Sequence, residues 1–157
     1  MFKCGDKILY PMHGAGVVEN IEMINIVGED KQYYVVKLPS KNMTVRIPVE
    51  NSDNLNLREI IDSKAVPEVF NVFKEDYVDK GLNWNKRFKY NMEKVKSGNI
   101  YELANVIKDL MLRDQDKGLS TGERKMLNDS KQLFVSEISL ASGREKLEVE
   151  NIIKGYF

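Results

Sequence analysis

The residues with the clearest chemical potential lie in one segment, NWNKRFKYNMEKVK, at positions 83–96. It contains the only tryptophan of the chain, Trp84, and five basic side chains against one acid, Glu93. The basic residues are Lys86, Arg87, Lys89, Lys94 and Lys96. Cationic side chains beside an aromatic ring can hold backbone phosphates and stack on exposed bases. The whole chain has a formal net charge of zero, so this surplus is local and argues against a general nucleic-acid coat protein.

Helical periodicity offers a simpler interpretation of Trp84. At 100° per residue, Trp84 shares one helix face with Phe88 and Val95, while the basic residues spread around the other faces. A helix-spaced aromatic residue usually packs in a core, so periodicity alone favours a buried position. Two features favour exposure instead: a polar segment precedes Trp84, and a side chain in the first helical turn points back past the helix start. Both interpretations stay open at this point.

Basic residues also occupy the first turn of two predicted helices. Lys86 and Arg87 do so in the helix that begins near Trp84, and Arg124 and Lys125 do so in a later one. The helix dipole favours acids at this end, so each cation costs about 0.3 kcal/mol or more unless something offsets it. An amide-rich helix start with basic side chains beside it suits phosphate groups. We therefore expect these residues to serve an anionic partner.

Residues that could support catalysis are few. Cys4 and His13 lack an identifiable orienting acid, which makes them a weak nucleophile pair. The sequence contains no GxxxxGK[ST] loop, no HExxH and no CxxC pair. We expect a protein that is not an enzyme, with no catalytic residues, no cofactor and no metal site. The alternative, a hydrolase that uses Cys4 as nucleophile, would lose its activity in a Cys4→Ser variant.

The first part of the chain has the pattern of short strands. Runs rich in β-branched and aromatic residues are separated by turn signals, which favours a small curled sheet or barrel. These runs are KILYP (7–11), GAGVVENIEMINIV (14–27), KQYYVVKL (31–38) and NMTVRIPV (42–49). GED at 28–30 predicts one hairpin turn and PSKN at 39–42 the next.

From about residue 57 the hydrophobic period becomes helical. Predicted helices cover about 64–74, 83–96, 100–117, 120–141 and 144–154. Three capping signatures mark helix starts: Asn99 with Glu102, Ser120 with Glu123, and Ser142 with Glu145. The fold class is therefore α+β, with a β domain over residues 1–55 and a helical domain over 56–157.

The chain has no sequence feature of membrane insertion or export. No run approaches the ~18 consecutive apolar residues of a membrane span. The start, MFKCGDKILYP, lacks the regions of a secretory signal. A single cysteine cannot form an internal disulfide, which fits a reducing compartment. We expect a cytoplasmic protein without a membrane partner.

Four motifs resemble the CarD/CdnL family of bacterial transcription regulators over essentially the whole chain. They are GDKILYPMHGAGVV (5–18), TVRIPVEN (44–51), NWNKRFKYNMEKVKSGN (83–99) and VIKDLMLRDQDKGLSTGERKML (106–127). The resemblance implies a Tudor-like N-terminal domain that docks on the β subunit of RNA polymerase, as in the transcription-repair coupling factor. It also implies a helical domain that meets promoter DNA at the upstream edge of the transcription bubble.

The resemblance also assigns roles to individual residues. Trp84 matches the family's minor-groove wedge. The phosphate contacts that it implies are Lys86, Arg87, Lys89 and Arg124. Arg46, in TVRIP, matches a polymerase-contacting arginine, whereas Ile24 stands where some members carry a second basic residue.

Together these observations predict a monomeric regulator with two attachment points. One domain binds RNA polymerase, and the other stabilises the open promoter complex with little sequence specificity, so the protein would associate with the nucleoid through polymerase. The alternative is an adaptor that acts through the β domain only, with a structural helical domain.

Overall fold

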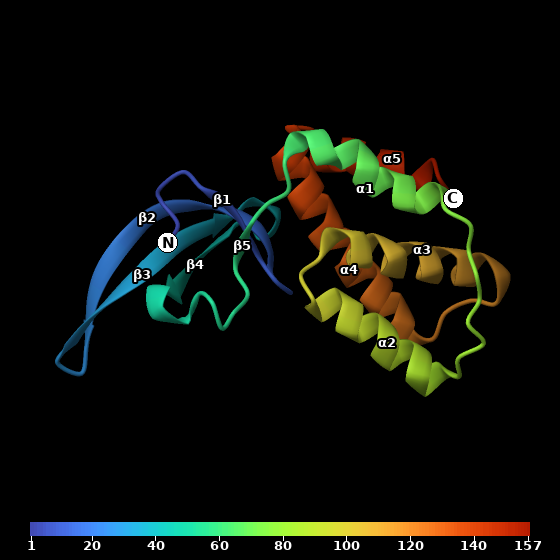
Figure 1. The fold of residues 1–157 in the computed structure, drawn as a ribbon, viewed down its shortest axis with the longest axis horizontal. Helices are drawn as coiled ribbons and strands as arrows, with labels where there is room; N and C mark the ends of the chain where they lie inside the picture. The colour runs from blue at the N-terminus through green and yellow to red at the C-terminus, as the bar shows by residue number, and fades with distance from the viewer.

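The computed structural model describes all residues, Met1–Phe157, as a β domain followed by five α-helices (Figure 1). The predicted α+β class is confirmed. All strand pairs are antiparallel, in the order β4-β3-β2-β1-β5. The strands are β1 (Lys7–Tyr10), β2 (Gly14–Ile26), β3 (Glu29–Leu38), β4 (Met43–Pro48) and β5 (Arg58–Glu59). β4 therefore forms one edge of the sheet and the two-residue β5 the other.

β2 and β3 form a long hairpin that projects away from the helices (Figure 1). Its turn consists of Val27 and Gly28, whose φ angles of 53° and 82° are both left-handed. A two-residue turn with positive φ at both positions matches the twist of the flanking strands. The predicted turn at 28–30 is wrong by one residue, because β3 already begins at Glu29.

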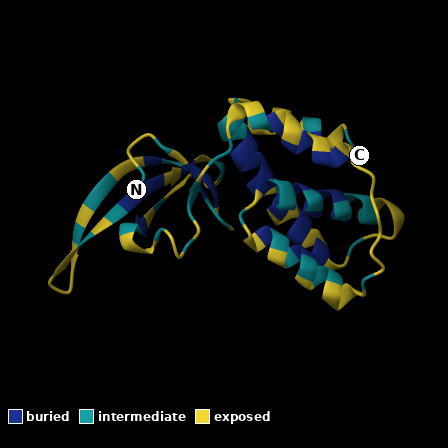
Figure 2. Cartoon of the chain, in the orientation of Figure 1, coloured by how far each residue is buried: buried dark blue, intermediate teal, exposed yellow.

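A small apolar core lies on one face of the sheet. Tyr34 is fully buried there, and its hydroxyl oxygen accepts a hydrogen bond from the backbone N–H of Phe2 at 3.0 Å. The core residues are Ile8, Val18, Tyr34, Val36, Leu38 and Ile47. Buried residues gather at the end of the sheet nearest the helices, whereas the far end of the hairpin is exposed or half-buried (Figure 2).

The helices enclose a second and larger core, in which α3 and α4 are central. The helices are α1 (Val66–Asn71), α2 (Trp84–Lys96), α3 (Ile100–Asp116), α4 (Thr121–Ser142) and α5 (Lys146–Lys154). The first predicted helix, 64–74, is α1 flanked by single 3-10 turns at 63–65 and 72–74. Core side chains include Phe70 and Phe73, whose rings both pack on the ring of Phe134 from α4.

Two of the three predicted caps are confirmed. The Asn99 side chain accepts from the backbone N–H of Tyr101 and Glu102, and the Ser120 hydroxyl accepts from that of Glu123. The third, Ser142 with Glu145, is wrong. Because α4 continues through Ser142, its hydroxyl donates within the helix to the carbonyl oxygen of Ile138 at 2.6 Å. Glu145 occupies the N-cap of α5 without a side-chain cap bond.

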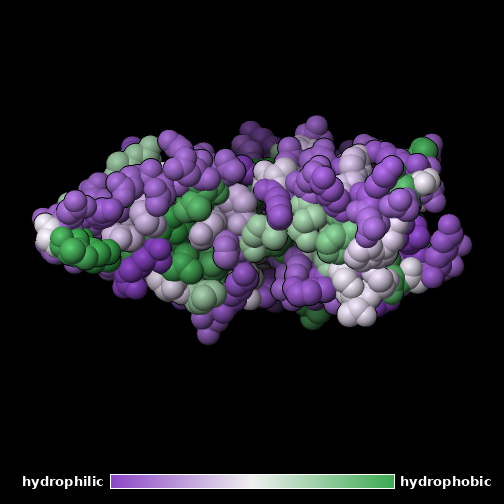
Figure 3. All heavy atoms as spheres, turned by 90° about the horizontal axis from the view of Figure 1, so that it is seen from below, coloured by the Kyte–Doolittle hydropathy of each residue, from purple (hydrophilic) through white to green (hydrophobic).

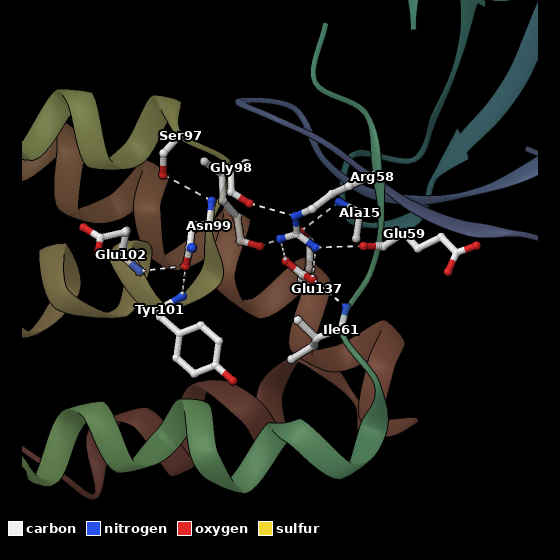
Figure 4. A network of polar contacts seen from close by, with 12 residues as sticks. Ala15, Arg58, Glu59, Ile61, Ser97, Gly98, Asn99, Tyr101, Glu102 and Glu137 are labelled. Carbon is white, nitrogen blue, oxygen red and sulfur yellow. Dashed lines mark hydrogen bonds and ion pairs between the residues drawn. The ribbon is translucent and has the colours of Figure 1, made fainter. Parts of the chain in front are cut away.

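A polar clamp joins the sheet to the helices (Figure 4). Arg58 of β5 donates from both terminal nitrogens to the carboxylate of Glu137 on α4, at 2.8 and 2.7 Å. Its Nε donates to the carbonyl oxygen of Gly98 at 2.9 Å, and the backbone N–H of Ile61 adds a third bond to Glu137. Nearby, the backbone N–H of Ala15 donates to the Ser136 hydroxyl. The sheet and the helices are thus held in one relative orientation. The division of the chain at residues 55 and 56 stays a prediction.

Candidate nucleic-acid and polymerase interfaces

Trp84 is the first residue of α2 and lies outside the helical core, with 43% of its surface exposed. Its ring stacks on that of Phe88, with the centroids 5.0 Å apart and the planes at 18°. Phe88 in turn packs on the core. The indole Nε1 donates to the Ser120 hydroxyl at 2.9 Å. The apolar stripe of α2 therefore begins at Phe88, and Trp84 is held on the surface beside the start of α4.

Lys86 and Lys89 are two unpaired cations in the first half of α2. Both are exposed, and neither side chain makes a hydrogen bond or an ion pair. They lie three positions apart, so they are neighbours on the helix side that faces away from the core. Two neighbouring like charges repel each other, and a polyanion would relieve that repulsion. Their roles as phosphate contacts stay predictions.

Arg87 has a different environment from the predicted phosphate contact. Only 11% of its side chain is exposed. Its Nε and Nη2 donate to the two carboxylate oxygens of Glu123, at 2.8 and 3.2 Å, and Nη1 donates to the carbonyl oxygen of Leu82. Arg87 thus links the first turn of α2 to the first turn of α4. Its charge is neutralised by a buried acid, which a phosphate would have to displace, and its predicted phosphate contact stays a prediction.

The ion pair with Arg87 also changes the pKa of Glu123. Burial opposes ionisation of Glu123, but the hydrogen bonds and the charge of Arg87 outweigh it, so the pKa of Glu123 lies below its usual value. The sequence identified Glu123 only as the acid of a capping box. Its second role arises because that box faces α2, a contact that no local pattern contains.

Arg124 is exposed but not free. Its Nη2 and Nη1 donate to the carboxylate of Asp114 on α3, at 2.7 and 3.3 Å, and 52% of the side chain remains exposed. Lys125 similarly pairs with Asp129 one turn further along α4. A phosphate that bound Arg124 would have to share it with Asp114 or displace that acid. Its predicted phosphate contact stays a prediction.

The segment that leads into Trp84 is fastened to the helices. The hydroxyl of Tyr77 donates to Asp109 of α3 at 2.8 Å, and the amide of Asn91 donates to the other oxygen of the same carboxylate at 3.0 Å. Burial and the adjacent carboxylate raise the pKa of Tyr77. Sequence reasoning missed this anchor, because Tyr77 lies in a charged segment without periodicity.

Arg46 lies on the edge strand β4, with 53% of its side chain exposed. Its Nε donates to Glu22 of β2 at 3.2 Å. Since side chains two apart on a strand share a face, Ile24 lies on the same face as Glu22 and therefore as Arg46. The hairpin continues into the exposed apolar residues Ile26 and Val27. Figure 3 shows hydrophobic atoms at this end of the molecule.

Cys4 and His13, the residues considered for catalysis, contact different neighbours. Cys4 is exposed, and its thiol donates to the carbonyl oxygen of Glu19. The ring of His13 lies against that of Tyr10, and partial burial together with the charge of Lys41 lowers its pKa. No group of three or more His, Cys, Asp or Glu residues is arranged to hold a metal ion. No helix combines the length and the hydropathy needed to cross a membrane.

Comparison with known proteins places both domains. Residues 2–61 match the CarD-like/TRCF RID domain, and residues 68–154 match the CarD, C-terminal domain. A Bacillus subtilis (strain 168) protein named "Putative transcription factor YdeB" is 37% identical over 151 residues, which cover 96% of this chain and 99% of that protein. The chain therefore belongs to the CarD/CdnL family and is a CarD-like transcription regulator.

Proposed function

We propose that this regulator is not an enzyme and acts from two attachment points, one on the RNA polymerase β subunit and one on promoter DNA. The observation that carries the proposal is Trp84, a large aromatic side chain fixed on the surface at the start of a helix that also carries the unpaired lysines Lys86 and Lys89. Such a ring can insert beside an opened base step in the minor groove while cations hold backbone phosphates. Working on polymerase, the protein would be cytoplasmic and associate with the nucleoid.

The polymerase contact is assigned to the outer face and free edge of β4. An unpaired edge strand can pair with a strand of a partner, and side chains beside it then give specificity. Arg46 is the exposed cation of this strand. The match of residues 2–61 to the CarD-like/TRCF RID domain supports polymerase as the partner. Ile24 contributes an apolar contact at the position where some family members carry a basic residue.

The DNA contact is assigned to the start of α2, with Trp84 as the wedge and Lys86 and Lys89 as the phosphate contacts. Arg124 joins them if phosphate displaces Asp114. Phosphate contacts position a protein without reading sequence, so little sequence specificity is expected. Binding as a monomer is sufficient, since one chain holds both surfaces.

The direct test is the lifetime of the open promoter complex with purified polymerase. A ligand shifts melting only by its preference for open over closed DNA. If Trp84 supplies a preference of ~1.4 kcal/mol, Trp84→Ala lowers the ratio of open to closed complex about tenfold, and the lifetime shortens by the same factor when the opening rate is unchanged. Leu147→Ala, another exposed large apolar side chain, is the control and should leave the lifetime unchanged. An unchanged lifetime with Trp84→Ala would refute the wedge and favour the adaptor that acts through its β domain only.

The tether is tested separately by capture of polymerase on immobilised protein. Arg46→Ala should weaken capture without changing thermal stability. Arg144→Ala is a matched control, because Arg144 is similarly exposed and also pairs with one acid, Glu148. Equal capture by the two variants would exclude Arg46 from the interface.

A further inference from the structure

The hydroxyl of Ser120 has no free hydrogen-bonding capacity. It accepts from the indole Nε1 of Trp84 at 2.9 Å and from the backbone N–H of Glu123 at 3.2 Å. It donates to the Glu123 carboxylate at 3.3 Å. A hydroxyl has one donor and two acceptor sites, so all are in use. The indole nitrogen therefore points at an acceptor that is itself fixed in direction.

The Trp84 ring is held on two further sides. One face stacks on Phe88. One edge lies against α4 at Gly122, where an added Cβ would be 3.7 Å from Trp84 Cζ2 and 3.5 Å from Phe88 Cε2. Glu123, whose carboxylate accepts the hydrogen bond from the Ser120 hydroxyl, is held in turn by Arg87. The indole is thus linked to the buried ion pair through Ser120, while 43% of the Trp84 surface is exposed.

We propose that Ser120 is a positioning residue for the DNA contact of Trp84, an inference that rests on the function proposed above. It has two effects. It keeps the ring in the orientation that can insert, and it occupies the only hydrogen-bond donor of the indole. Minor-groove edges of A·T pairs present only acceptors, whereas G·C pairs add a donor. A ring without a free N–H meets either pair through its apolar surface, so the wedge does not discriminate by hydrogen bonding.

Ser120→Gly isolates this role from helix capping. Glycine is nearly as well tolerated at an N-cap as serine, yet it offers the indole no acceptor. Ser120→Thr keeps the hydroxyl and should behave like the wild type. Asn99→Gly makes the same kind of change at the N-cap of α3, where no tryptophan is involved, and serves as the matched control.

The first measurement uses the free protein and needs no label, because Trp84 is the only tryptophan. We expect Ser120→Gly to lower the fluorescence anisotropy and raise acrylamide quenching of Trp84, while Ser120→Thr and Asn99→Gly leave both unchanged. In the wild type, the indole N–H should give one NMR resonance that exchanges with solvent more slowly than free tryptophan. A freely exchanging indole in the wild type would overturn the proposal even if Ser120→Gly proved unstable. A folded glycine variant with unaltered anisotropy would overturn it as well.

The second measurement is the open-complex lifetime with polymerase. Immobilising one side chain affects an equilibrium about two- to tenfold, so Ser120→Gly should shorten the lifetime by that factor. The change should vanish in a Trp84→Ala background. A shortening of equal size in that background would mean that Ser120 acts independently of Trp84, which refutes positioning. If Trp84→Ala itself has no effect, the proposed wedge fails, while the fluorescence result still decides whether Ser120 fixes the ring.

A separate measurement tests whether the wedge discriminates between A·T and G·C pairs. On promoters that carry A·T or G·C pairs at the upstream bubble edge, the wild-type protein should lengthen both lifetimes by a similar factor. With its N–H released, Ser120→Gly should favour the A·T promoter. A strong A·T preference already present in the wild type would contradict a sequestered donor.

Discussion

Glu137→Gln is the sharpest perturbation of the domain clamp, because it changes one buried atom and the charge but keeps the shape. Glu137 is 1% exposed and accepts three hydrogen bonds, two from Arg58 and one from the backbone of Ile61. In glutamine an amide nitrogen replaces one of the two carboxylate oxygens. Its N–H groups then face an N–H group of Arg58 or Ile61, so one hydrogen bond has two donors and no acceptor. Hydrogen bonds to charged groups contribute about 1.5–3 kcal/mol each.

The structure sets the expected size of the effect. Arg58 remains 32% exposed and keeps its bonds to the carbonyl oxygens of Gly98 and Glu59, so water and these groups recover part of its solvation. This places the loss at the lower end of the range for breaking a buried ion pair, at about 3 kcal/mol of unfolding free energy. The exposed pair Arg144–Glu148 is the control, and Glu148→Gln should cost less than about 0.5 kcal/mol.

Urea denaturation measures both variants, and a distance measurement shows what the clamp does. Cys4, exposed in the β domain, is the only cysteine and accepts one spin label, and Asn128→Cys on the exposed side of α4 accepts the other. The wild-type pair should give a narrow distance distribution that broadens in Glu137→Gln. If Glu137→Gln costs no more than Glu148→Gln and the distribution stays narrow, the clamp does not hold the domains.

Two further predictions concern substitutions of Glu123 and of Gly16. The pKa of Glu123 is lowered by folding, so its contribution is fully present above the unfolded value near 4.3 and is lost as the pH falls through the lower folded value. Glu123→Gln should therefore lower the unfolding free energy by about 3 kcal/mol at pH 7. Between pH 6 and pH 3 the variant should lose less unfolding free energy than the wild type, which urea titrations at each pH will test. At Gly16, an added Cβ would lie 2.5 Å from the carbonyl oxygen of Lys37. Gly16→Ala should then lower the unfolding free energy by about 3 kcal/mol, whereas Gly122→Ala, with contacts no closer than 3.5 Å, should not, and equal melting temperatures would contradict this.

Local patterns predicted the fold well where they had length to act on. The four long strand runs and the amphipathic helices lie within two residues of the observed elements, apart from the first helix. β5 was missed because two residues carry no alternation. The turn was misplaced because Val27, a β-branched residue, adopts a left-handed conformation that sequence rules assign to glycine or asparagine.

The site was predictable only in part, for a physical reason. The first-turn cations of α2 are anomalous against the helix dipole, and the sequence cannot tell which partner offsets them. For Arg87 the partner is Glu123, 36 residues away, and for Arg58 it is Glu137, 79 residues away. Such pairs exist only after the helices pack. The same holds for Ser120, whose capping role was visible and whose contact with Trp84 was not.

The distribution of paired charge sets how strongly the free protein would bind DNA in the proposed function. Arg87 and Arg124 are each paired with an acid, so the free protein presents few uncompensated cations around Trp84. Each phosphate neutralised contributes a slope of about −0.9 to the salt dependence of binding, and two lysines alone give weak affinity. In the proposed function, attachment to polymerase would supply an effective concentration of order mM for a short linkage. The clamp between Arg58 and Glu137 would then matter for that function, because a tethered wedge acts only where its tether places it.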